Sequence, residues 1–143
     1  MGGINLARVL LGGLLAGLVL NVGEYILNEL ILAEQWAAYM AEAGMEEFTG
    51  GQIATFVIVT FVFGIVMVWI YAAIRPRFGP GPKTAVIAGL TMWSVGWLLI
   101  GLSLFAAGTY PADLTFVKLT RFFRHDCVTF YFFNCHLFSS EGI

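Results

Sequence analysis

The chain has 143 residues, of which 59% are hydrophobic and 11% are charged, and its mean hydropathy is +0.87. Soluble globular domains contain roughly 25% charged residues, so the composition excludes that class and indicates one integral membrane domain, residues 1–143. The formal net charge of -2 excludes the basic stripe that nucleic-acid-binding proteins usually carry, so no nucleic-acid partner is expected.

The first predicted transmembrane helix covers residues 9–33. Crossing a hydrocarbon core about 30 Å thick takes about 20 apolar residues in a helix, and this run is long enough. It is also longer than the apolar region of a signal peptide, and no small-residue cleavage site interrupts it near residue 20. We therefore expect an uncleaved first span.

One face of this span carries small and polar residues at helical spacing. Successive members are separated by four, four, three and four positions, so a regular helix places them on one side: Gly13, Gly17, Asn21, Glu24 and Asn28. Glycines at this spacing let a second helix approach closely, and asparagine side chains can form hydrogen bonds across the contact. The sequence predicts a helix-packing face at Gly13 and Gly17 and an intramembrane polar site at Asn21, Glu24 and Asn28.

Glu24 allows two interpretations. A carboxyl group inside a membrane is a candidate proton or cation site, which would make the chain a coupled transporter or a channel-like protein. Alternatively, Glu24 forms hydrogen bonds within a packing contact between helices. The packing interpretation is favoured, because the other two predicted spans contain no second acidic or basic residue and proton relays usually need several.

The first connector is acidic and contains no lysine or arginine. Its early part is expected to form an interfacial helix anchored by Trp36 and Tyr39, and Gly44 and the pair Gly50 and Gly51 are expected to interrupt the connector. Its acidic residues are Glu34, Glu42, Glu46 and Glu47.

The second predicted span covers residues 53–74, and its single small or polar positions, such as Gly64, are typical of packing. The second connector, RPRFGPGPK, is short and basic. Its prolines are expected to prevent it from continuing either neighbouring helix, and Thr84 is expected to cap the following one.

The third predicted span covers residues 85–107. Small residues again share one face, which makes this span the expected packing partner of the first. The proposed packing positions are Gly89, Gly96 and Ser103, flanked by Ala85 and Ala107.

Lysine and arginine in short loops stay on the cytoplasmic side of a membrane. The basic second connector is therefore predicted to lie inside, together with the N-terminus, and the acidic first connector outside. The fold class that follows is an all-α membrane bundle of three transmembrane helices and a degenerate or displaced fourth C-terminal segment.

The tail from about residue 120 to residue 143 differs from the rest of the chain. A helix there would carry Arg121, Arg124 and Asp126 near its centre, and each costs roughly 2.5 to 3.5 kcal/mol to insert. Two explanations stay open: an interfacial segment, or a reading-frame shift near Thr120 that replaced a fourth helix. The tail also contains two histidines and two cysteines, but their spacing does not fit a structural zinc site, so no metal is predicted.

Motifs for other activities are absent from the sequence. The segment GPGPKT lacks the glycines of a phosphate-binding loop, and there is no serine-hydrolase elbow or zinc-protease motif. We expect neither an enzyme nor a cofactor. The expected partners are the lipid bilayer and, through the small-residue faces, a second copy of the chain.

Three segments, NVGEYILN, AEQWAAYM and WIYAAIRPRFGPGPKTAVIAGL, resemble a group of small uncharacterised bacterial inner-membrane proteins with four predicted spans. The resemblance covers residues 1 to about 120 and ends before the tail. It implies a multi-pass architecture and a location in the bacterial cytoplasmic membrane, and it implies no chemistry. The apolar fourth helix usual in that group is missing here.

Overall fold

The computed structural model describes residues 4–109 together with residues 115, 116 and 120. The described part is helical and contains no strand, which confirms the all-α prediction. The tail after residue 120, with its potential fourth segment and its histidines and cysteines, lies outside the described residues. The elements in order are α1 (Leu6–Tyr25), η1 (Ile26–Ile31), α2 (Ala33–Glu42), α3 (Gly50–Phe78), α4 (Pro82–Trp93), η2 (Ser94–Leu99) and α5 (Ile100–Ala106), where η1 and η2 are π-helical.

Three continuous helical stretches are long and apolar enough to cross a membrane. They cover Leu6–Ile31, Gly50–Phe78 and Pro82–Ala106, with 26, 29 and 25 residues. At about 1.5 Å per residue each is roughly 40 Å long, which exceeds a hydrocarbon core of about 30 Å. The three predicted spans are therefore confirmed, and each extends a few residues beyond its predicted start.

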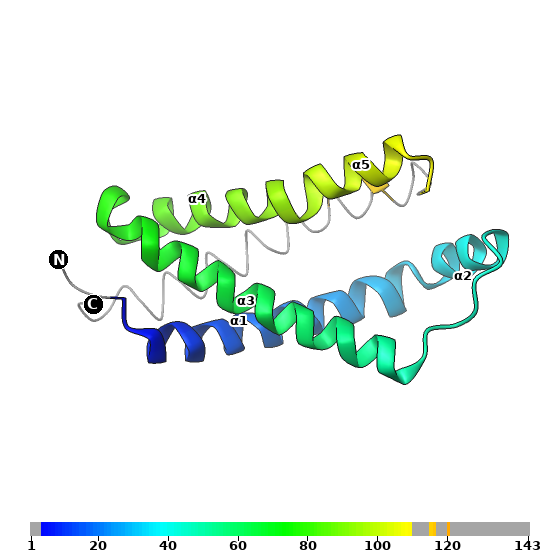
Figure 1. The fold of residues 1–143 in the computed structure, drawn as a ribbon, viewed down its shortest axis with the longest axis horizontal. Coiled ribbons are helices and arrows are strands. Elements are labelled where there is room, and N and C mark those ends of the chain that lie inside the picture. Colours follow the sequence, from blue (N-terminus) through cyan, green and yellow to red (C-terminus); the bar gives the residue numbers. More distant parts are fainter. Residues whose placement is uncertain (1–3, 110–114, 117–119, 121–143) are drawn as a thin grey trace.

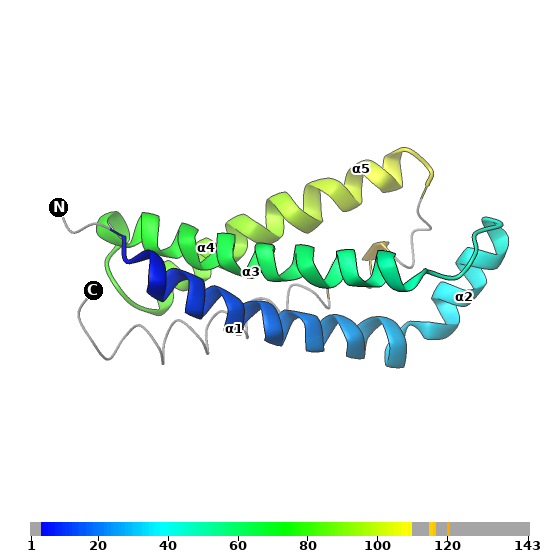
Figure 2. The ribbon, with the colours of Figure 1, turned by 60° about the horizontal axis from the view of Figure 1, so that its bottom comes forward.

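The spans form an antiparallel arrangement around α3. Figure 1 shows the start of α1, the end of α3 and the start of α4 at one end of the molecule, with α2 and α5 toward the other. In Figure 2, α1 runs beside α3, while the third span leaves α3 progressively from α4 to α5. The α1–α3 pair is therefore the best-packed part of the described bundle.

Local sequence explains where the first two spans begin. The Asn5 side chain accepts a hydrogen bond from the backbone N–H of Arg8, 3.2 Å away, at the start of α1. Thr49 and Gln52 form a reciprocal capping box at the start of α3. Both devices satisfy backbone N–H groups that lack a partner in the first turn of a helix.

Two expectations about the second connector are wrong. α3 continues through Pro76 to Phe78. A proline this close to the end of a helix removes one backbone hydrogen bond and leaves the remaining turn possible. The residue before α4 is Gly81, which provides no side-chain cap, and Thr84 instead donates from Oγ1 to the carbonyl of Gly79 at 2.6 Å.

The first connector begins with the predicted helix, whereas Gly50 and Gly51, the pair expected to interrupt the connector, form the start of α3. α2 contains both Trp36 and Tyr39. The chain then leaves the helix at Gly44, whose φ of 63° lies in the left-handed region that favours glycine. The Tyr39 hydroxyl donates to the carbonyl of Thr109 at 2.7 Å, which connects α2 to the end of the third span.

The buried core lies between the spans, and their outer faces are apolar. One cluster joins Leu20 of α1 to α3 and α4, through Met67, Tyr71, Ala85 and Ala88. Large apolar side chains on the outside of α3 stay exposed, such as Ile58 at 62% and Val62 at 53%. Apolar outer faces on all three long helices are what a lipid environment requires, and they identify a membrane protein.

Candidate functional site

The closest helix contact joins Gly13 and Gly17 of α1 to Gly64 of α3. A Cβ atom added at Gly64 would lie 2.6 Å from both the Gly13 carbonyl oxygen and the Gly17 nitrogen. Reciprocally, one added at Gly13 would lie 2.4 Å from the Ile65 Cα. Such separations leave no room for a side chain, so the two backbones touch along this contact.

Asn21 lies one turn beyond Gly17, at the edge of this contact. Its Nδ2 donates to the Gly17 carbonyl at 2.8 Å and reaches the Val57 carbonyl of α3 at 3.4 Å. The second contact is at the long limit for a hydrogen bond. The Asn21 amide therefore forms its main hydrogen bond within its own helix and adds a weak hydrogen bond to α3.

Glu24 and Asn28 form a hydrogen-bonded network with Trp36. Asn28 Nδ2 donates to Glu24 Oε2 at 2.6 Å and to the Glu24 carbonyl at 2.9 Å. Trp36 Nε1 donates to Asn28 Oδ1 at 3.0 Å. All three side chains are half-buried. Asn28 is the centre of the network, because its amide serves the carboxyl group on one side and the indole on the other.

The five-residue stripe predicted on one regular helix is divided between two neighbours. α1 ends at Tyr25, and the following turn, η1, has hydrogen bonds five residues apart, such as Leu32 N to Leu27 O at 2.9 Å. Gly13, Gly17 and Asn21 lie against α3, while Glu24 and Asn28 are linked to α2. The assumption of one regular helix through residue 33 is wrong, because the wider turn changes the spacing after Tyr25.

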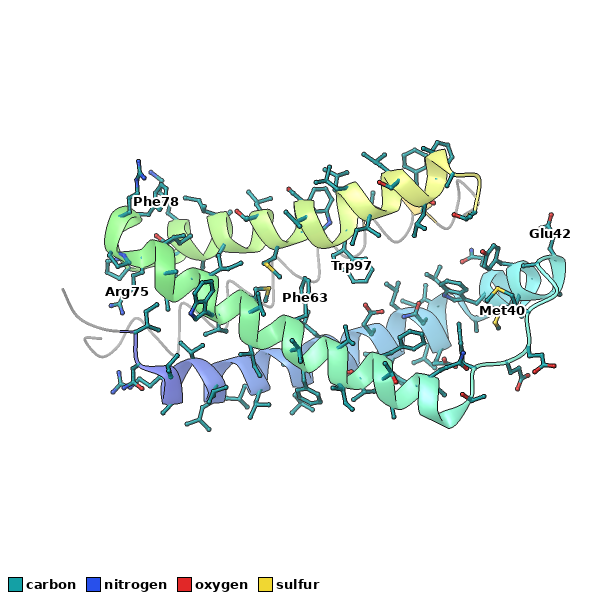
Figure 3. The ribbon with its side chains drawn as sticks, in the orientation of Figure 1. Met40, Glu42, Phe63, Arg75, Phe78 and Trp97 are labelled. Carbon is teal, nitrogen blue, oxygen red and sulfur yellow. The ribbon has the colours of Figure 1, made fainter. Side chains whose placement is uncertain are left out.

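Three tryptophans pack against two buried leucines, one in η1 and one directly after it. Leu27 and Leu32 are 7% and 1% exposed, and Trp36, Trp93 and Trp97 pack against them. Trp93 and Trp97 come from the third span, where Trp97 belongs to the π-helical η2. Figure 3 shows Trp97 on the side of the third span that faces the first. The polar network therefore lies next to an aromatic cluster that joins α2, η1 and the third span.

The small residues of the third span do not form the predicted seam with α1. A Cβ atom added at Gly96 would meet the Phe63 ring of α3, 2.9 Å away. Gly89 is buried, and Ser103 is exposed and donates to the Leu99 carbonyl on its own helix at 2.8 Å. Among the described residues, Gly13 and Gly17 lie against α3, and the first span contacts the third through Leu20 and the tryptophans beside Leu27. The predicted pairing of small residues between these two spans is therefore wrong at Gly13 and Gly17.

Sequence reasoning missed two residues of the site. In the sequence Gly64 is one isolated small position, and its contact with Gly13 and Gly17 becomes visible only when α1 and α3 are placed side by side. Trp36 is predicted only as an interfacial anchor, and the sequence gives no sign that its indole N–H donates to Asn28. The eight-residue separation between Asn28 and Trp36 includes a π-helical turn, so a regular helical pattern does not relate them.

Within residues 4–109 and the few described positions beyond, no group of three histidine, cysteine or acidic side chains could hold a metal ion. No family model matches this chain, and comparisons with curated proteins and with solved structures also find no match.

Proposed function

We propose that this chain is a helix-packing or assembly component of a bacterial cytoplasmic membrane, without enzymatic activity. The observation that supports this proposal most strongly is the glycine contact between α1 and α3, where Gly64 lies directly against the backbone at Gly13 and Gly17. Close backbone contact of this kind stabilises helix association in lipid through van der Waals packing.

The polar network supports the same proposal. Glu24 Oε2 accepts a hydrogen bond from Asn28, and Asn28 in turn accepts one from Trp36, so the carboxyl group is linked to a neighbouring helix of the same chain. A hydrogen-bonded carboxyl group in a protein contact fixes the position of α2 relative to the first span. Glu24 needs no transported ion to account for its place in this network.

The alternative is a proton- or cation-coupled transporter or channel-like protein that uses Glu24. One observation favours it: Glu24 lies two residues before the start of the π-helical η1, and π-helical turns frequently occur at functional sites. The two functions predict different consequences for the same substitution.

The substitution Glu24→Gln distinguishes the packing role from the transport role. Glutamine keeps the shape and still accepts a hydrogen bond from Asn28, but it cannot ionise. For a packing role we expect the free energy of unfolding to change by about 1 kcal/mol or less. We also expect no proton or cation flux through wild-type protein in liposomes. The measurements are denaturation in detergent micelles and ion flux after reconstitution.

Glu29→Gln is the matched control, because Glu29 lies nearby in η1 and its side chain is exposed. It should leave both unfolding and flux at wild-type values. The packing proposal is wrong if wild-type protein conducts ions, Glu24→Gln abolishes that flux without loss of stability, and Glu29→Gln does not.

The proposed orientation places the N-terminus and the α3–α4 connection in the cytoplasm. It is supported by the positions of Arg75, Arg77 and Lys83, which follow the rule for basic residues in short loops. Gly44 and Gly79 are unsuitable labelling sites because their φ values of 63° and 82° disfavour cysteine. Phe78 and Met45 are better sites, since they are 48% and 47% exposed.

With Cys127 and Cys135 replaced by serine, a membrane-impermeant thiol reagent should label Met45→Cys in intact cells. Phe78→Cys should react only after the cells are opened, because the membrane separates it from the reagent. Labelling of Phe78→Cys in intact cells, with Met45→Cys protected, would reverse the orientation.

A further inference from the structure

The charges of the described residues are completely separated along the bundle. All the basic ones lie at the end formed by the start of α1, the end of α3 and the start of α4: Arg8, Arg75, Arg77 and Lys83. Figure 3 shows Arg75 and Phe78 at this end and Glu42 at the opposite one. The described acidic residues begin at Glu24 and continue through η1, α2 and the acidic connector. We refer to the four basic residues as the basic end.

The described part of the chain provides no counter-charge for the basic end. No ion pair joins any of its four side chains to an acidic residue there, and Arg8, Arg77 and Lys83 are exposed. Helix dipoles stabilise only two of the four cations. Arg75 and Arg77 lie in the last turn of α3, where a cation is favourable, whereas Arg8 and Lys83 lie in first turns, where it is unfavourable. An anion from outside the bundle would stabilise all four.

The connection that carries this charge is held in place by buried side chains. Thr84 Oγ1 donates to the Gly79 carbonyl at 2.6 Å, and the Gly81 N–H donates to the Tyr71 hydroxyl at 3.3 Å. Thr84 and Tyr71 are only 1% and 2% exposed. The turn between Arg77 and Lys83 is therefore fixed to the core, and little ordering entropy is lost when an anion binds there.

Helix length places the basic end at the level of lipid headgroups. α3 has 29 residues and is thus about 44 Å long, whereas the hydrocarbon core is about 30 Å thick. Its last turn therefore extends into the headgroup layer. Trp69 and Phe78, which are 47% and 48% exposed, provide aromatic side chains before and after Arg75, as membrane interfaces commonly require.

We infer that the basic end binds the phosphate groups of anionic phospholipids, and that it thereby anchors the α1, α3 and α4 ends to one leaflet. Lipid headgroups and free phosphate ions carry the same charged group, and we assign the site to the phosphate of a lipid headgroup. Exposed aromatic and apolar side chains beside the cations fit a lipid with acyl chains and offer nothing to a free anion. The inference is independent of the role of Glu24.

Quenching of tryptophan fluorescence can measure whether the protein prefers an anionic lipid to a zwitterionic one. The full chain is reconstituted in phosphatidylcholine bilayers that contain either brominated phosphatidylglycerol or brominated phosphatidylcholine. A cation near an anionic surface contributes about 1 kcal/mol, or about fivefold in binding. We expect brominated phosphatidylglycerol to bind at least about fivefold more tightly than brominated phosphatidylcholine. The preference should fall as salt concentration rises.

The triple variant Arg75→Gln, Arg77→Gln, Lys83→Gln keeps only Arg8 of the basic end and should reduce this preference at least about fivefold. The matched control, Glu42→Gln, Glu46→Gln, Glu47→Gln, changes three charges at the opposite end and should retain the wild-type preference. Trp69→Phe should remove most of the lipid-dependent signal, because Trp69 is the exposed tryptophan on the helix that ends in Arg75 and Arg77.

Equal quenching of wild-type protein by the two lipids would overturn the inference, as would a full preference in the triple variant. If inorganic phosphate displaced phosphatidylglycerol more effectively than chloride at equal ionic strength, the site would be one for free anions and the lipid assignment would be wrong. If the triple variant does not fold, Arg77→Gln alone tests the same point. It changes one exposed side chain and should reduce the preference severalfold.

Discussion

Gly64→Ala is expected to destabilise the protein by about 2–3 kcal/mol, because it places a methyl group inside the α1–α3 contact. The added Cβ would lie 2.6 Å from the Gly13 oxygen and the Gly17 nitrogen and 2.8 Å from the Gly17 Cα. All three atoms belong to the α1 backbone, so no side-chain rotation relieves the overlap and α1 must move away from α3. Denaturant titration of the purified chain, followed by circular dichroism, measures the loss.

Gly51→Ala is the matched control on the same helix. A Cβ atom there has no neighbour within 4 Å, so the substitution should be neutral or slightly stabilising through helix propensity. Gly96→Ala should be intermediate, because its nearest neighbour is the Phe63 ring, which can rotate. Equal unfolding of Gly64→Ala and Gly51→Ala would show that α1 and α3 do not touch at Gly64, and the packing proposal would lose its main support.

Asn28→Leu is expected to cost about 1–3 kcal/mol, more than Glu24→Gln, because Asn28 is the centre of the polar network. The substitution removes the 2.6 Å hydrogen bond to Glu24 Oε2 and the 3.0 Å hydrogen bond from Trp36 Nε1 together. Both neighbours are half-buried, so water replaces these hydrogen bonds poorly. The free energy of unfolding measures the loss, and proteolysis within α2 reports whether that helix separates from η1.

Asn21→Leu provides the comparison for Asn28→Leu, since it makes the same chemical change two turns earlier. The Asn21 amide bonds mainly to the Gly17 carbonyl of its own helix, and its contact with α3 is 3.4 Å long. We therefore expect a loss below about 1 kcal/mol, with α2 unaffected. If the two substitutions cost the same, the network with Trp36 contributes nothing beyond an ordinary asparagine in a transmembrane helix.

The polar site was only partly predictable. Glu24 and Asn28 were found because polar residues inside an apolar run are conspicuous, and the sequence alone shows that contrast. Their hydrogen bond to each other fits the four-residue spacing of a regular helix, whereas the bond from Trp36 to Asn28 joins α2 to the π-helical turn at Ile26–Ile31. Such a turn inserts one residue into the helical spacing, and no residue in ILNELI signals it, since isoleucine, leucine and glutamate also fit a regular helix.

The helical class, the three spans and the separation of basic from acidic connectors follow from the amino-acid sequence, because hydropathy and charge act locally along the chain. Which spans pack together depends on the fold. Small residues on the first and third spans suggested a direct pairing, and the structure instead places Gly13 and Gly17 of α1 against Gly64 of α3. The physical reason is that a small residue shows where a backbone can approach, while the identity of that backbone depends on how the helices are arranged around one another.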